Sequence, residues 1–384
     1  MTSLPRLRCD IFCNVIDNFG DIGVCWRLAR QLTHEFDLEV RLWVNELQVF
    51  AGICPEIDPQ QAEQIVLGIA VHQWGSDFRN ITPGDIVIEA FACQLPDDFV
   101  AAMAQRTPKK PAWINLDYLS AEGWVSGCHA LPSPHPRLPI TKYFFFPGFD
   151  ESTGGLLREK DLPSLREQFV ASQGEQNAFW SRLKITPPAK DALAISLFAY
   201  ENQAIVPLLS ALTQRGKSIC CLAPITRTQA LVEAFAGHAV KAGDRIRRGS
   251  LEIILLPFMH QDDYDRLLWF CDVNLVRGED SFVRAQWAAK PLVWHIYPQE
   301  DEAHRIKLEA FLDRYCVDLP PQLNTLVRNF FLGWNGLGAF SPALVDEWME
   351  NLVVLRQHAE KWEKNLSKQQ DLCTSLVRFC KSKL

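Results

Sequence analysis

Residues 9–31, CDIFCNVIDNFGDIGVCWRLARQ, decide the fold class. The first eight of them are mostly apolar and β-prone, which predicts a short buried strand. The next stretch, residues 17–23, contains two glycines and two aspartates and predicts a turn. The amphipathic run that follows, ending near Gln31, predicts a helix. A strand, a loop and a helix in this order are typical of a parallel α/β sheet.

The same alternation continues along the first half of the chain. We expect further strands at residues 38–44, 65–72, 85–90, 113–116 and 143–146, with helix-like segments such as 96–106 between several of them. Alternating β and α segments predict a mostly parallel sheet with helices on both faces.

A second α/β series follows residues 184–190, KITPPAK, where two adjacent prolines predict a hinge. Strands are expected at 192–198, 218–222, 251–256, 273–276 and 291–295, with helices at 202–215, 228–236, 262–270 and 280–289. From Ser341-Pro342 onward, apolar residues at three- and four-residue spacing predict one long helix, broken near Ser367. We therefore predict domains at residues 1–183 and 184–361, facing a cleft, with residues 362–384 packing back on the first.

Composition excludes several classes of protein. The chain has 384 residues, and its 46 acidic side chains outnumber its 39 basic ones, giving a net charge of −7 that disfavours a nucleic-acid partner. No apolar run is long enough to span a bilayer, and no signal peptide is recognisable, so we expect no membrane contact and a cytoplasmic location. The 12 cysteines are scattered, with no C-x-x-C pair and no zinc-like spacing, as is usual for free thiols.

The loop after the first expected strand is the richest in chemistry. Asp17 and Asp21 are four residues apart, and Gly20 and Gly23 let a ligand approach a helix start, where free N–H groups favour an anion. The G-x-G-x-x-G fingerprint of dinucleotide sites is absent. Either aspartate could instead cap the helix by accepting backbone hydrogen bonds, and the sequence leaves both interpretations open.

A second polar cluster is expected after the strand at 273–276. Arg277 can bind phosphate in bidentate fashion, and the Ser281 hydroxyl lies at the same helix start, although a capped helix with a surface arginine fits equally. Polar and aromatic residues after neighbouring strands could hold a base, although aromatic residues there are more often core. These are Phe198, Tyr200, Phe258, Gln261 and Tyr297. Carboxylates in one half and a nucleotide site in the other suit a nucleotide-sugar glycosyltransferase.

Six motifs carry a resemblance to a known family: I-F-C-x-V-I-D-N-F-G-D-I-G-V-x-W-R-L-A-R (11–30), I-E-A-F-A-C (88–93), W-I-N-L-D-Y-L-S-A-E (113–122), F-A-Y-E-N (198–202), R-G-E-D-S-F-V-R-A-Q-W (277–287) and K-P-L-V-W-H-I-Y-P-Q (290–299). In order and spacing they resemble the bacterial EarP family of protein-arginine rhamnosyltransferases. The resemblance extends over nearly the whole chain.

The resemblance implies a GT-B fold of two Rossmann-like domains. It implies transfer of L-rhamnose from dTDP-β-L-rhamnose to an arginine of translation elongation factor P, with inversion, no cofactor and no metal. Asp21 would be the general base and Asp17 a second essential carboxylate. The donor would be held by the following residues: Asn18, Phe19 and Gly20 in the first half; Phe198, Tyr200, Phe258 and Gln261 around thymidine; and Arg277, Glu279, Asp280, Ser281 and Tyr297 around deoxyribose and pyrophosphate.

The chemistry explains why paired carboxylates are needed. An arginine side chain stays protonated in proteins, so its nitrogen is a poor nucleophile. Two aspartates can accept guanidinium hydrogen bonds, orient one nitrogen and take up a proton. The leaving nucleotide would be stabilised by Arg277, Ser281 and a helix N-terminus.

Two other functions fit the same sequence. A nucleotide-sugar epimerase or hydrolase would need the donor site but no acceptor protein. A non-catalytic nucleotide-binding protein would retain the donor site, with Asp17 and Asp21 serving only as helix caps.

Overall fold

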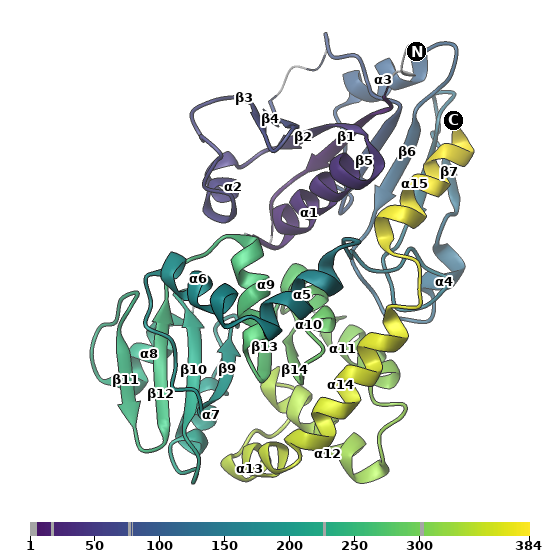
Figure 1. Ribbon diagram of the computed structural model, residues 1–384. Helices are drawn as coiled ribbons and strands as arrows, with labels where there is room; N and C mark the ends of the chain where they lie inside the picture. The colour runs from purple at the N-terminus through teal and green to yellow at the C-terminus, as the bar shows by residue number, and fades with distance from the viewer. Residues whose placement is uncertain (1–5, 17–18, 76–77, 79, 226–227, 300–302) are drawn as a thin grey trace. The chain divides into compact units, whose positions relative to one another are not determined.

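The chain forms two compact units in a computed structural model that describes residues 6–16, 19–75, 78, 80–225, 228–299 and 303–384 (Figure 1). The first unit comprises Met1–Lys160 and Lys368–Leu384, and the second comprises Asp161–Ser367. Within the described residues, no helix is long and apolar enough to cross a membrane. All twelve cysteines are free thiols, as their spacing predicts.

The first unit is built on an eight-stranded sheet of order β3-β4-β2-β1-β5-β6-β8-β7. The strands from β4 to β8 in this order pair in parallel, and β3 and β7 add antiparallel edges. The strands are β1 (Arg8–Cys13), β2 (Glu39–Val44), β3 (Glu63–Val66), β4 (Ile69–Gln73), β5 (Ile86–Ala90), β6 (Ala112–Leu116), β7 (Pro132–Pro134) and β8 (Thr141–Phe145). The helices are α1 (Phe19–Phe36), α2 (Leu47–Ile53), α3 (Asp97–Gln105), α4 (Val125–Cys128) and α15 (Leu372–Lys383).

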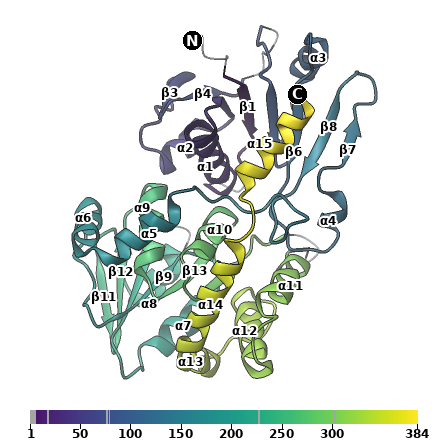
Figure 2. The ribbon, with the colours of Figure 1, turned by 45° about the vertical axis from the view of Figure 1, so that its right-hand side comes forward.

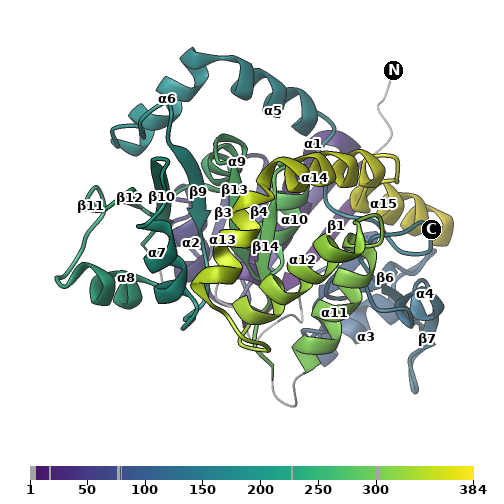
Figure 3. The ribbon, with the colours of Figure 1, turned by 90° about the horizontal axis from the view of Figure 1, so that it is seen from below.

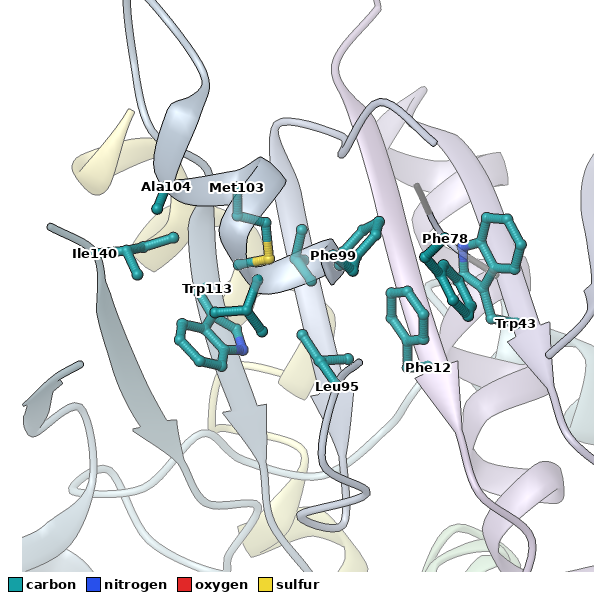
Figure 4. Close-up of a cluster of buried hydrophobic side chains, with 11 residues drawn as sticks. Phe12, Trp43, Phe78, Leu95, Phe99, Met103, Ala104, Trp113 and Ile140 are labelled. Carbon is teal, nitrogen blue, oxygen red and sulfur yellow. The ribbon is translucent and has the colours of Figure 1, made fainter. Parts of the chain in front are cut away.

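Alternate residues of β1 serve the two faces of this sheet, because successive side chains of a strand point to opposite sides. The Cys13 thiol meets Cys25 of α1, and α15 lies beside α1 on β6 (Figure 2). Phe12 points the other way, where its ring stacks on Trp43 at 5.7 Å and meets Phe99 of α3 edge-on at 4.9 Å (Figure 4). The sheet is therefore covered on both faces, as a parallel sheet requires.

The second unit repeats the plan with a six-stranded sheet of order β11-β12-β10-β9-β13-β14, in which only β11 is antiparallel. Its strands are β9 (Leu193–Leu197), β10 (Ile219–Pro224), β11 (Arg245–Arg248), β12 (Leu251–Leu256), β13 (Val273–Arg277) and β14 (Leu292–His295). Its helices are α5 (Leu162–Ala171), α6 (Gln173–Leu183), α7 (Ile205–Leu212), α8 (Gln229–Ala236), α9 (Gln261–Phe270), α10 (Asp280–Trp287), α11 (Ala303–Tyr315), α12 (Pro321–Trp334), α13 (Pro342–Glu350) and α14 (Leu352–Leu366).

The boundaries of the two units differ from the predicted ones. α5 and α6 precede the KITPPAK hinge yet belong to the second unit, since Phe169 packs on Trp269 of α9 and Arg182 forms an ion pair with Asp263 of the same helix at 2.7 Å. The predicted division at residue 183 therefore lies inside the second unit. The segment that returns to the first unit begins at Lys368.

The tail forms three helices in place of the single long one. The predicted N-cap is confirmed, because the Ser341 hydroxyl accepts a hydrogen bond from the Leu344 N–H and Pro342 begins α13. The predicted break near Ser367 is present between α14 and α15, and a further break at Asn351 separates α13 from α14 (Figure 3). The run predicted as one strand at 65–72 is instead the hairpin of β3 and β4, since Leu67 and Gly68 both have positive φ and turn the chain.

Candidate functional site

Asp21 lies in the first turn of α1 at the carboxyl edge of the first sheet, with only 2% of the residue exposed. Its Oδ2 accepts a hydrogen bond from the Ile16 N–H at 2.8 Å, and its Oδ1 accepts one from the Tyr118 hydroxyl at 3.2 Å. The first bond ties α1 to the residue three positions before its start, so it differs from a helix cap, in which the carboxylate accepts from the first N–H groups of the helix itself. The second bond joins the first turn of α1 to the loop after β6, a contact that no local pattern predicts.

The other residues expected in this loop have different placements. Asp17 and Asn18 lie outside the described residues, so their predicted roles stay predictions. The Phe19 ring lies over Gly52 of α2, where its Cε1 is 2.8 Å from the position that a β-carbon would take. Phe19 thus packs α1 against α2, a role that the sequence did not indicate.

The turn between β13 and α10 holds the charged part of the second cluster. Gly278 has a φ of 62°, the left-handed conformation that glycine adopts without strain, and it reverses the chain directly after Arg277. The Ser281 hydroxyl accepts a hydrogen bond from the Arg277 N–H at 3.1 Å and donates one to the Arg277 carbonyl. In this structure Ser281 therefore fixes the turn that carries Arg277.

Aromatic rings surround the Arg277 guanidinium. Its central carbon lies 4.4 Å from the ring centroid of Phe198 and 4.8 Å from that of Tyr200, and Nη1 donates to the Ala199 carbonyl at 3.2 Å. Tyr297 meets Tyr200 edge-on at 5.4 Å. These contacts join the carboxyl ends of β9, β13 and β14, which adjoin one another in the sheet.

His295, at the end of β14, is a buried member of this cluster for which the sequence predicted no specific role. Its ring meets Tyr200 edge-on at 5.4 Å, and burial, followed by the nearby Arg277 and His304 charges, lowers its pKa to about 4. The ring is therefore neutral at pH 7. A histidine that follows a buried strand gives no signal of this role in one sequence.

Two further predicted residues meet at the N-terminal ends of α9 and α10. The Gln261 amide donates to the Asp280 carboxylate at 3.3 Å, which links the two helix starts. Phe258 precedes α9 and is 40% exposed, so its ring is available to a ligand. Glu279 precedes α10, next to Gly278. The second sheet thus gathers at one edge the polar and aromatic residues predicted to hold a nucleotide.

Two solved structures share this architecture. MurG of Acinetobacter baumannii is 12% identical, with a TM-score of 0.50 and coverage of 98% of this chain and 100% of that one. TcCGT1, solved in complex with UDP, is 10% identical, with a TM-score of 0.51 and coverage of 98% and 99%. The chain has the GT-B fold of glycosyltransferases.

Sequence comparisons identify the family. Residues 9–381 match the family described as Elongation-Factor P (EF-P) rhamnosyltransferase EarP. A protein-arginine rhamnosyltransferase of Pseudomonas aeruginosa is 49% identical, covering 96% of this chain and 98% of its own, and one of Neisseria meningitidis is 36% identical, covering 93% and 91%. A structure described as "Structural basis for EarP-mediated arginine glycosylation of translation elongation factor EF-P" is 34% identical, with a TM-score of 0.71 and coverage of 99% and 100%.

The chain belongs to the EarP family and is a glycosyltransferase, a protein-arginine rhamnosyltransferase. The resemblance carried by its motifs is confirmed.

Proposed function

We propose that the protein transfers L-rhamnose from dTDP-β-L-rhamnose to an arginine side chain of translation elongation factor P, with inversion at the anomeric carbon and in the cytoplasm. Its relatives are named protein-arginine rhamnosyltransferases, and the matching solved structure concerns arginine glycosylation of EF-P. The cytoplasm is proposed because the acceptor is a translation factor. The observation that carries the proposal is the Asp21 carboxylate, held from two loops at the carboxyl edge of a Rossmann-like sheet.

The donor part of the proposal rests on the second unit. Its phosphate partner is Arg277, whose permanent charge can neutralise the nucleoside diphosphate as it leaves. Phe258, Phe198, Tyr200 and Tyr297 supply apolar surface for the base and deoxyribose. Gln261 and Asp280 offer amide and carboxylate groups to the edges of the base and to sugar hydroxyls.

The acceptor part rests on Asp21. A guanidinium binds carboxylates strongly and with fixed geometry, so an aspartate orients the acceptor and removes a proton as the nitrogen attacks. The new bond joins a guanidinium nitrogen to the anomeric carbon, while the bond from that carbon to the diphosphate oxygen breaks. One displacement of this kind inverts the configuration of the carbon.

Mass spectrometry tests the proposal. Purified protein, incubated with dTDP-β-L-rhamnose and EF-P, should add the mass of one deoxyhexose to a single arginine peptide, and NMR of that peptide should report the α linkage. An EF-P variant with that arginine replaced by lysine, and UDP-glucose as donor, are the controls. Free rhamnose or an isomerised nucleotide sugar, with unmodified EF-P, would point to a hydrolase or an epimerase instead.

A further inference from the structure

The Tyr118 side chain, half-buried in the loop after β6, connects two elements that are distant in sequence. Its hydroxyl donates to Asp21 Oδ1 at 3.2 Å, while the Ile16 N–H holds the other oxygen at 2.8 Å. Hydrogen bonds to both oxygens restrain the plane of a carboxylate more tightly than a bond to one oxygen does.

The Tyr118 ring is itself held by a stacked partner. It lies 4.4 Å from the Phe91 ring with an interplanar angle of 16°. Phe91 follows β5 and has a φ of 55°, and Ala92 and Gln94 have φ values of 53° and 54°. Left-handed conformations are unfavourable for these residues, and they persist only where the surroundings fix them.

The structure contains the groups that fix this loop. The buried Glu89 carboxylate accepts the Gln94 N–H at 3.1 Å and pairs with Lys142 at 3.2 Å. The Phe91 N–H donates to the Leu116 carbonyl at 2.7 Å. Phe91 is thus a rigid platform that sets the position of the Tyr118 ring, and with it the position of the hydroxyl.

We propose that Tyr118 is a positioning residue for the Asp21 carboxylate, with Phe91 as its platform. The inference rests on the proposed function, because it gives the Tyr118 hydroxyl a purpose only if Asp21 receives a proton from the acceptor arginine. Tyr118 then acts through Asp21 and contributes nothing to the donor site of the second unit.

The orientation of the carboxylate decides the expected size of the effect. Loss of orientation of a reacting group lowers rates by up to about 100-fold. We therefore expect Tyr118→Phe, which removes one of the hydrogen bonds to the carboxylate, to slow transfer about 10-fold.

Single-turnover transfer with enzyme in saturating excess measures this directly, because the rate constant is independent of any inactive fraction. Tyr118→Phe retains the ring that stacks on Phe91 and should slow transfer about 10-fold while leaving the dTDP affinity unchanged. Phe91→Leu retains the Tyr118 hydroxyl but removes the aromatic ring on which Tyr118 stacks, so it should also slow transfer. Tyr143→Phe, a hydroxyl deletion in β8 of the same unit, is the matched control and should react like the wild type.

A double-mutant cycle then separates positioning from a general structural effect. In an Asp21→Ala background, Tyr118→Phe should cause no further loss of rate, because the carboxylate that it orients is gone. A wild-type rate in Tyr118→Phe, or an undiminished loss in the Asp21→Ala background, would overturn the inference. If the wild-type protein itself fails to modify EF-P, it is the proposed function that fails.

Discussion

Arg277 lies with its guanidinium against Phe198 and Tyr200, and this contact fixes a charge that would otherwise swing on a flexible side chain. We expect Arg277→Ala to weaken dTDP binding by about 1.5 to 3 kcal/mol, the range for a charge-assisted hydrogen bond, which is about 10- to 150-fold in Kd. Isothermal titration calorimetry with dTDP measures the change.

The control for this variant is Arg266→Ala, which removes an arginine of α9 that pairs with Asp263 on its own helix. It should bind dTDP like the wild type. Arg277→Lys should show intermediate affinity, because the charge remains but the planar fork and the stacking are lost. Unchanged affinity in a folded Arg277→Ala protein would remove Arg277 from the donor site.

Asp10 and Asp21 illustrate what single residues do not disclose in a sequence. Asp10 lies in β1 and is fully buried, and its carboxylate pairs with Arg41 at 2.6 Å and accepts the Gly84 N–H at 2.7 Å. It is a structural ion pair within the sheet. The glycines beside Asp21 predicted a functional role for this residue. Its hydrogen bond from Tyr118 depends on tertiary structure alone and could not be predicted.

At the scale of an element, the end of β14 introduces a pH dependence. Burial lowers the pKa of His295 from 6.5 to about 4, so the unfolded chain binds a proton at higher pH than the folded one. The stability conferred by the neutral ring is complete above pH 6.5 and is lost as the pH falls from 6.5 towards 4. At pH 5.5 the loss is about 1 kcal/mol.

Urea unfolding at pH 7.5 and pH 5.5, followed by tryptophan fluorescence, tests this dependence. His295→Gln, which cannot acquire a charge, should lose less stability between the two pH values than the wild type does. His34→Gln, at the exposed end of α1, is the matched control and should keep the wild-type dependence. Identical pH dependence in His295→Gln and the wild type would show that His295 is not the source of the loss of stability at low pH.

Most elements that build the two sheets could be predicted because their patterns are local. The apolar run of β1, the paired glycines after it and the spaced apolar residues of α10 all lie within one window of sequence. β11 (Arg245–Arg248) was missed because its sequence, RIRR, is charged, and edge pairing to β12 alone defines it. The sequence did not predict that α6 belongs to the second unit, because its partner in that unit, α9, lies about 80 residues away in the chain.

At the scale of the whole molecule, the first unit is closed by a segment from the far end of the chain. The Leu372 N–H donates to the Leu156 carbonyl at 2.9 Å, and Gln31 of α1 donates to the Asp371 carboxylate at 3.2 Å. Gly155, with a φ of 78°, lets the chain pass so closely that a β-carbon would lie 2.2 Å from the Gln370 carbonyl. Such contacts connect residues more than 200 positions apart. The sequence could therefore predict only that the C-terminal residues pack back on the first unit.

The reaction as a whole should proceed without a divalent metal. Arg277 and the start of α10 can meet the charge of the leaving diphosphate, which is the role that a metal would otherwise have. Multiple-turnover transfer to EF-P should therefore continue in excess EDTA at the rate measured with added Mg²⁺. A rate abolished by EDTA and restored by Mg²⁺ or Mn²⁺ would contradict this prediction.

The most direct test of the role proposed for Asp21 is the Asp21→Asn variant in single-turnover transfer of rhamnose to EF-P with saturating donor. Asparagine keeps the size and the hydrogen bond from Ile16 but cannot take a proton, so the rate should fall by about 100-fold or more while dTDP affinity and thermal stability stay close to the wild type. If Asp21 only caps α1, asparagine, itself a good cap, should sustain the rate. A normally stable Asp21→Asn protein that transfers rhamnose at the wild-type rate would contradict the role of Asp21 as the general base.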